Sequence, residues 1–203
     1  MSDLGRIGVF GGTFDPIHNT HLAIARAARE QAKLDVVLFV VSANPPHKRG
    51  ATFASPEDRL ALVEAAVAHG PGMASSRLEL DRGGPSYTAD TLEALHEQYP
   101  RAELFLIIGM DSLIDLPKWR SPDRIIELAH LLVVPRPGEA DVPELVRGRY
   151  TTLAFSETEV SSTDIRARIE SGDPCADLLP PAVSALIQQR ALYRECAEHP
   201  ARG

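Results

Sequence analysis

Cysteine is scarce in this 203-residue chain, which contains only Cys175 and Cys196 and no Cys-x-x-Cys pair. Two cysteines so placed do not predict a disulfide scaffold or a zinc site. Their scarcity is typical of a protein that works in a reducing compartment.

Long hydrophobic runs are also missing. No apolar run approaches the roughly 20 residues that span a bilayer. The first residues, Met-Ser-Asp-Leu-Gly-Arg, lack the charged and apolar regions of a signal peptide. We therefore expect a cytoplasmic protein without a membrane partner.

Positive charge is in deficit, with 21 Lys and Arg against 28 Asp and Glu and a formal net charge of -7. This balance argues against a broad nucleic-acid-binding surface, although it permits a local basic pocket. The hydrophobic content of 44% and charged content of 24% are typical of a globular protein. We expect one domain over residues 1–203, with a core over 1–150 and a C-terminal part over 151–203.

Internal repeats and low-complexity tracts are absent, and apolar runs instead alternate with helical patterns. Strands are predicted at 6–10, 36–42, 73–80, 103–108, 131–134 and 151–155. Helices are predicted at 19–33, 56–69, 87–99, 122–128, 142–147, 162–171 and 181–193. The alternation predicts an α/β fold: a doubly wound, Rossmann-like parallel sheet with helices on both faces and a small helical C-terminal subregion. Ligands of such sheets bind at the carboxyl ends of the strands.

The loop after the first predicted strand carries the strongest functional signal. Residues 11–21 read Gly-Gly-Thr-Phe-Asp-Pro-Ile-His-Asn-Thr-His. The pattern is neither the G-x-G-x-x-G of dinucleotide-binding oxidoreductases nor a P-loop. Gly11 and Gly12 permit a sharp turn that Thr13 and Phe14 extend. His18 and His21 lie on one face at a helix start, where free N–H groups attract phosphate.

A second helix start carries hydroxyl groups and a cation. Ser162, Thr163 and Arg166 belong to the run Ser-Ser-Thr-Asp-Ile-Arg. Hydroxyls, free backbone N–H groups and a forked guanidinium together suit phosphate oxygens. We interpret this helix start as the second half of a triphosphate site.

Three further segments follow predicted strands or open a helix at the ligand edge of the sheet. His47 and Lys48 belong to a basic Pro-Pro loop. Gly109 and Asp111 follow the most hydrophobic strand and precede Trp119, the only tryptophan, whose indole offers a stacking face. Thr88 lies at a helix start, where backbone N–H groups can receive an anion.

With these motifs assembled, the chain resembles the nucleotidyltransferase superfamily marked by His-x-Gly-His and a later Ser-Ser-Thr-x-Ile-Arg. More narrowly, it resembles the bacterial nicotinate-nucleotide adenylyltransferases from Gly8 to about Tyr193. The resemblance rests on Gly-Gly-Thr-Phe-Asp-Pro-Ile-His, Pro-Pro-His-Lys, Ser-Tyr-Thr-Ala-Asp-Thr-Leu, Gly-Met-Asp-Ser-Leu, the Trp119 segment, Arg-Pro-Gly at Arg136 and Ser-Ser-Thr-Asp-Ile-Arg.

The resemblance implies transfer of AMP from ATP to nicotinate mononucleotide, by direct in-line attack and with pyrophosphate as the other product, in NAD biosynthesis. It implies Mg²⁺ bound with the ATP, mainly through phosphates and water, and no metal ligands from the protein.

The resemblance also assigns residues to each substrate. On the ATP side it places Gly11, Gly12, Thr13, Phe14, His18, His21, Gly109, Asp111, Arg136, Ser162, Thr163 and Arg166, with His18, His21 and Arg166 as catalytic residues. Gly109 and Asp111 fall at the adenosine ribose and Arg136 near the adenine. On the nicotinate-nucleotide side it places His47, Lys48, Thr88 and Trp119, with the indole stacked on the pyridine ring.

One position departs from the family pattern. Thr20 stands where the pattern has glycine. A β-branched side chain there crowds the adenine or ribose, so we predict weaker ATP binding without loss of activity.

Several alternatives stay open at this point. The acceptor could be nicotinamide mononucleotide or pantetheine phosphate, and a cytidylyltransferase or a non-catalytic nucleotide-binding protein is a further alternative. The strictness of the nicotinate preference and the oligomeric state are also open, with a homo-oligomer as one alternative.

Overall fold

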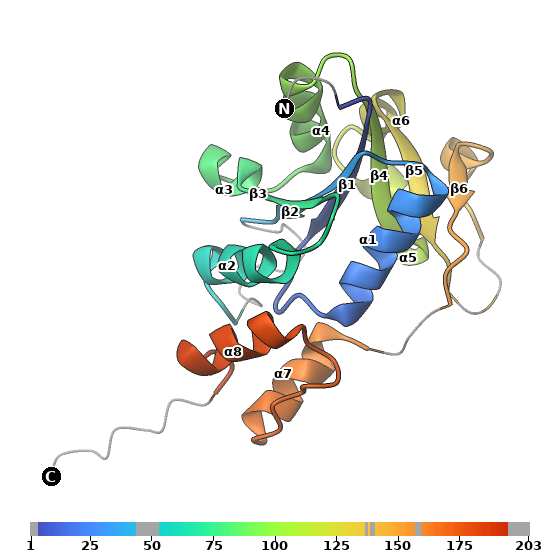
Figure 1. The fold of residues 1–203 in the computed structure, drawn as a ribbon. Coiled ribbons are helices and arrows are strands. Elements are labelled where there is room, and N and C mark those ends of the chain that lie inside the picture. Colours follow the sequence, from blue (N-terminus) through green and yellow to red (C-terminus); the bar gives the residue numbers. More distant parts are fainter. Residues whose placement is uncertain (1–3, 44–52, 137, 139–140, 157–159, 195–203) are drawn as a thin grey trace, which may run out of the picture.

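A six-stranded parallel sheet forms the centre of the molecule (Figure 1). The computed structural model describes residues 4–43, 53–136, 138, 141–156 and 160–194. The strands lie in the order β3-β2-β1-β4-β5-β6. Their bounds are β1 Arg6–Gly12, β2 Val36–Val41, β3 Met73–Ser76, β4 Glu103–Gly109, β5 Ala129–Val134 and β6 Tyr150–Thr152. This is the doubly wound, Rossmann-like arrangement that the sequence predicted.

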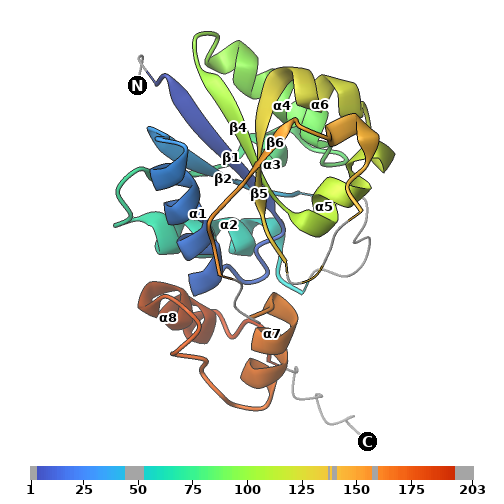
Figure 2. The same cartoon turned by 90° about the vertical axis from the view of Figure 1, so that its right-hand side faces the viewer.

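Helices cover both faces of the sheet, as Figure 2 shows. The α-helices are α1 Asn19–Gln31, α2 Pro56–Val67, α3 Leu78–Arg82, α4 Thr88–Gln98, α5 Met110–Asp115, α6 Pro122–Leu128, α7 Ser162–Glu170 and α8 Pro181–Gln189. Two 3-10 helices, η2 Leu116–Lys118 and η3 Glu144–Val146, complete the described elements. None of the helices in the described ranges is long and apolar enough to cross a membrane.

Alternation of side chains along the strands divides the core into two layers. Phe105 and Ile107 of β4 face the layer formed with α1, α2, α7 and α8. Leu104 and Leu106 face the opposite layer, formed with α4, α5 and α6. The strand order reverses between β1 and β4, which pair side by side. Crevices at the carboxyl ends of such strands are where this architecture binds ligands.

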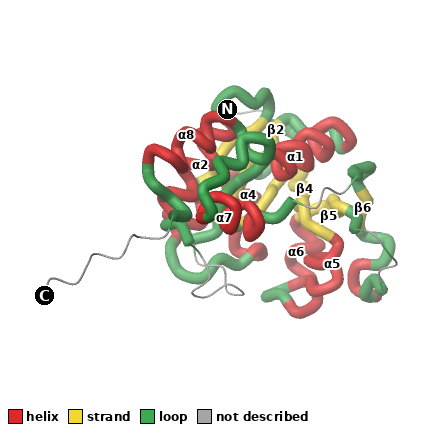
Figure 3. Tube along the Cα trace, turned by 90° about the horizontal axis from the view of Figure 1, so that it is seen from below, coloured by secondary structure: helices red, strands yellow, loops and turns green. Residues whose placement is uncertain are grey.

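The C-terminal helices α7 and α8 lie below that carboxyl edge, which Figure 3 shows from underneath. The backbone N–H of Asn19, at the start of α1, donates to the carbonyl of Leu178 at 2.9 Å. The Asn19 side chain donates to the carbonyl of Asp177 at 3.2 Å. The C-terminal part is therefore docked against the loop between β1 and α1.

The structure corrects several local predictions. Gly11 and Gly12, predicted to turn after the first strand, are the last two residues of β1. The strand predicted at 73–80 ends at Ser76, and Leu78–Arg82 form α3. The helix predicted at 142–147 is only the 3-10 turn Glu144–Val146, which follows Pro143. Residues 110–118, for which no element was predicted, form α5 and η2. Apolar alternation suggested the longer strand, but burial of Glu79 with Thr91 favours a turn into α3.

Candidate active site

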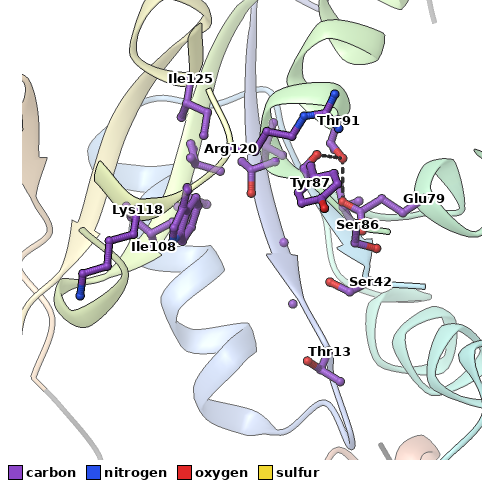
Figure 4. A pocket seen from close by; sticks show the side chains of 18 residues that line it. Thr13, Ser42, Glu79, Ser86, Tyr87, Thr91, Ile108, Lys118, Arg120 and Ile125 are labelled. Carbon is purple, nitrogen blue, oxygen red and sulfur yellow. Dashed lines mark hydrogen bonds between the residues drawn. The ribbon is translucent and has the colours of Figure 1, made fainter. Parts of the chain in front are cut away.

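Two cavities meet at the carboxyl end of β1 and share Gly12 and Thr13 as lining residues. The larger, about 700 Å³, is called the histidine cavity because His18 and His21 line it. The smaller, about 490 Å³, is called the tryptophan cavity because Trp119 lines it (Figure 4). A molecule that occupied both would pass over the end of the central strand.

His18 and His21 lie together at the start of α1. His18 is the N-cap residue, and its backbone N–H donates to Nδ1 of His21 at 3.3 Å. The two ring centroids are 3.8 Å apart. Burial lowers the pKa of His18 to about 4, because a charged imidazole loses hydration there. His18 is thus a neutral imidazole at pH 7, and its Nδ1 makes no well-formed hydrogen bond within the described residues.

The start of α7 forms the opposite wall of the histidine cavity. Ser161 caps the helix by accepting the N–H of Asp164 at 3.1 Å. The hydroxyl of Ser162 donates to the carbonyl of Pro16 at 3.0 Å. Ser162 and Pro16 are 146 residues apart in the sequence. Their hydrogen bond joins the two predicted phosphate-binding segments directly.

Arg166 projects from α7 toward the same cavity. Its guanidinium donates to the carbonyl of Asp15 at 2.7 Å and to the hydroxyl of Thr163 at 3.2 Å. The ring of Phe53 lies 4.3 Å from the guanidinium carbon. Among the described side chains, no carboxylate forms an ion pair with Arg166, so its charge is available to an anion.

The tryptophan cavity combines one aromatic wall with a helix start. Trp119 follows η2, and Thr88 is the first residue of α4. Arg120 extends across from the Trp119 segment, with its guanidinium 4.7 Å from the ring centroid of Tyr87 and 3.2 Å from a carboxylate oxygen of Asp90. Figure 4 shows Tyr87 and Arg120 among the side chains around this cavity.

The structure places three predicted residues beside the cavities rather than in their linings. Gly109 ends β4 and pairs with Val134 of β5. Asp111 and Arg136, which come shortly after these two strand ends, hydrogen-bond to each other. His47 and Lys48 lie outside the described residues. Thr20 does line the histidine cavity, as the predicted crowding requires.

Sequence reasoning missed several groups around the cavities. Glu79 and Arg120 line the tryptophan cavity. Arg59 is fully buried beneath the loops, although an arginine on a surface-type helix predicts exposure. The apolar neighbours Leu60, Leu62 and Val63 were the available signal that this part of α2 is buried.

Comparison with known proteins gives consistent matches. The cytidylyltransferase-like family matches residues 9–168. A protein of Roseiflexus castenholzii, named a probable nicotinate-nucleotide adenylyltransferase, is 44% identical over 94% of this chain and 98% of its own. A Thermus thermophilus protein of the same name is 45% identical over 93% of this chain and 100% of its own.

A solved structure supports the fold independently. The Plasmodium falciparum nicotinic acid mononucleotide adenylyltransferase complexed with NaAD superposes with a TM-score of 0.76. The match covers 93% of this chain and 97% of that one at 15% identity. At this identity the likeness shows the shared fold alone.

Proposed function

Because this chain belongs to the cytidylyltransferase-like family and, within it, to the nicotinate-nucleotide adenylyltransferases, we propose that it transfers AMP from ATP to nicotinate mononucleotide. The products are nicotinate adenine dinucleotide and pyrophosphate. The observation that carries the proposal is the junction of the two cavities at Gly12 and Thr13. It gives a donor and an acceptor separate sites that share a wall.

The histidine cavity suits the triphosphate. A phosphate oxygen of the acceptor forms a bond to the α-phosphorus while the bond to the β-phosphate bridging oxygen breaks, and pyrophosphate leaves. No proton has to move to balance this step. The protein therefore contributes position and charge stabilisation, which are the main terms in phosphoryl transfer.

His18, His21 and Arg166 are the groups we assign to that stabilisation. A neutral imidazole contributes an N–H donor, and approaching phosphate charge raises the pKa of His18 from its low value. Arg166 adds a permanent cation, and the start of α7 adds Ser162 and Thr163. Gly12, Thr13 and Phe14 line the histidine cavity where β1 ends, and Gly11, one residue earlier in the strand, lines the tryptophan cavity.

The tryptophan cavity suits the acceptor. The indole of Trp119 offers a face for a pyridine ring, and the start of α4 at Thr88 offers backbone N–H groups to a carboxylate. Lys118 and Arg120 also line the cavity, and each pairs with a carboxylate, Asp115 at 2.6 Å and Asp90 at 3.2 Å. The start of α4 favours nicotinate over nicotinamide, although the buried carboxylate of Glu79 opposes it.

The remaining assignments follow the family resemblance. Gly109 and Asp111 would meet the adenosine ribose, and Arg136 would lie near the adenine. His47 and Lys48 would approach the reacting phosphates from the acceptor side. We propose no partner beyond these small molecules, apart from a second copy of the chain as a candidate homo-oligomer.

Magnesium is proposed to arrive with ATP. The described residues contain no group of three His, Cys, Asp or Glu side chains placed to hold a metal ion. We propose that the ion is held mainly by phosphate oxygens and water, as Mg²⁺ commonly is when it accompanies a nucleotide. When bound, the ion would neutralise part of the triphosphate charge.

Pyrophosphate release tests the proposal. The protein is assayed with ATP and Mg²⁺ against nicotinate mononucleotide, nicotinamide mononucleotide and pantetheine phosphate at equal concentrations. We expect release with the nicotinate nucleotide. Release only with another acceptor would assign the chain to that acceptor, and ATP binding without release would indicate a non-catalytic nucleotide-binding protein.

Arg166→Gln and Arg168→Gln form a matched pair for the same assay. Arg168 lies on α7 too, but it pairs with Asp173 at 2.7 Å and Asp177 at 3.2 Å and lines neither cavity. We expect kcat/KM to fall about 100-fold or more for Arg166→Gln. Arg168→Gln should keep wild-type kcat/KM, and equal losses in both would contradict the role of Arg166.

A further inference from the structure

Asp15 is a buried carboxylate in the loop between β1 and α1, only 4% exposed. Its Oδ2 accepts the backbone N–H of Phe53 at 2.8 Å. Its Oδ1 accepts the N–H of Ala54 at 3.2 Å and the hydroxyl of Tyr193 at 2.8 Å. One side chain thus joins the segment before α2 and the turn after α8 to the loop that carries His18.

The same residue also holds Arg166 from two directions. The backbone carbonyl of Asp15 accepts the guanidinium at 2.7 Å. Its carboxylate holds the backbone of Phe53, whose ring lies 4.3 Å from that guanidinium. A guanidinium fixed by a carbonyl on one side and a ring on the other has few orientations left.

Arg59 contacts two of the segments that Asp15 joins, the loop after β1 and the segment before α2. Its guanidinium is fully buried and donates to the carbonyls of Thr13, Ser42, Ala43 and Ala54 at 2.7–3.4 Å. Burial lowers the pKa of Arg59, and the negative charge of Asp15 opposes that shift. A buried cation whose direct partners are neutral carbonyls needs a nearby anion, and Asp15 supplies it.

We propose that Asp15 and Tyr193 are positioning residues for Arg166, so that the turn after α8 supports the donor-phosphate site through Asp15 without lining it. The hydroxyl of Tyr193 donates a hydrogen bond to Asp15 and so fixes its carboxylate. That carboxylate in turn holds the backbone of Phe53 against the loop between β1 and α1. The inference rests on the proposed function for the identity of the donor. It assigns a role in ATP binding to a residue four positions beyond the end of the last helix.

Tyr193→Phe removes the hydroxyl and keeps the ring, and Arg190→Gln is its matched control. Arg190 ties the same C-terminal segment to α2 through Asp58 at 2.7 Å. Neither residue lines either of the two cavities, and the two differ in that Tyr193 hydrogen-bonds to Asp15. For each full-length variant, ATP dissociation is measured by calorimetry, melting by thermal denaturation, and KM for both substrates by pyrophosphate release.

We expect Tyr193→Phe to weaken ATP binding by about fivefold to tenfold and to leave the acceptor KM within about twofold. Asp15→Asn should weaken ATP binding further, because an amide nitrogen would face the N–H donors. Arg190→Gln should bind ATP as the wild type does. Because Asp15→Asn could fail to fold, the Tyr193 comparison decides the matter.

Unchanged ATP binding in Tyr193→Phe would overturn the proposal, as would equal weakening in Tyr193→Phe and Arg190→Gln. Either result would mean that Tyr193 only holds the C-terminal segment in place and does not position Arg166. Calorimetry with ATP does not depend on turnover. A wild type that binds ATP without releasing pyrophosphate would therefore contradict the proposed function while leaving this inference testable.

Discussion

His18 couples the stability of the fold to pH through its burial. Its pKa is about 4 in the folded protein against 6.5 for a solvated imidazole, so between these values the unfolded chain binds more protons. The free energy of unfolding therefore rises with pH through this window and is lost as pH falls through it. The full shift corresponds to about 3 kcal/mol.

Urea denaturation at pH 7, 5.5 and 4.5 measures this effect. We expect His18→Gln to lose less stability on acidification than the wild type. His69→Gln, which changes an exposed histidine at the end of the α2 region, should follow the wild type. A His18→Gln variant with the wild-type slope would show that the imidazole is not the cause.

Thr20 is the second residue of α1 and lines the histidine cavity. Thr20→Gly should lower the KM for ATP by about fivefold, since even one methylene too many in a tight site costs roughly 1 kcal/mol and the whole threonine side chain is removed. Glycine also weakens a helix by about 0.5–1 kcal/mol relative to alanine, so melting should fall slightly. Thr20→Ala shortens the side chain without the helix cost of glycine, so comparing the two variants separates the crowding of ATP from the loss of helix stability. Unchanged KM and kcat in Thr20→Gly would remove the crowding hypothesis.

At the scale of elements, α2 and α7 begin with the same cap but lie at different distances from the site. Ser55 accepts the N–H of Asp58 at 3.1 Å, and Ser161 accepts that of Asp164 at 3.1 Å. Each serine also donates to the aspartate carboxylate, at 2.7 Å and 2.6 Å respectively. Only Ser161 lines a cavity.

Ser55→Ala and Ser161→Ala should each destabilise the protein by about 1 kcal/mol, as loss of an N-cap does. Only Ser161→Ala should raise the KM for ATP, because the loosened turn carries Ser162 and Thr163. Thermal denaturation and steady-state kinetics measure the two quantities. A rise in KM for both variants would mean that the effect comes from general loosening.

The elements also show what local sequence can and cannot predict. The start of α1 is well marked, because His18 caps a helix that begins at Asn19 as predicted. The end of β1 is not, because the strand continues through Gly11 and Gly12, which pair with Val40 and Val41. The strand predicted over 73–80 was wrong beyond Ser76, because Leu78 and Leu80 continue an apolar alternation. In the structure Leu78–Arg82 form α3, where Glu79 is buried and accepts the hydroxyl of Thr91, twelve residues later, at 2.6 Å. Tertiary contacts of this kind override local preference.

The residues around the site also divide into those that the sequence predicted and those that it did not. Histidines, Ser162 and Arg166 were predicted because their phosphate chemistry is visible at helix starts. Arg59 and Tyr193 were not, because their partners are carbonyls and a carboxylate brought together by the fold. Localisation, oligomeric state and the division near residue 150 stay predictions.

At the scale of the whole molecule, the proposed assignment of one substrate to each cavity makes the reaction product a ligand of both. Nicotinate adenine dinucleotide should raise the melting temperature more than either substrate at equal concentration. Ligand at 100 times its dissociation constant stabilises a fold by about 2.7 kcal/mol, so the differences are measurable. Trp119→Leu should reduce the shift with the dinucleotide and the mononucleotide but not with ATP. A reduced shift with ATP would contradict the proposal that the Trp119 indole contacts the nicotinate nucleotide rather than ATP.

The shared wall of Gly12 and Thr13 also has a consequence for inhibitor chemistry. A flat ring suited to Trp119 and a small polyanion suited to Arg166 could each bind weakly alone. Joined by a short linker across that wall, each fragment would hold the other at a millimolar effective concentration. The avidity of such a bivalent compound would depend on the linker matching the span between the cavities, so a series of linker lengths would measure that span in solution.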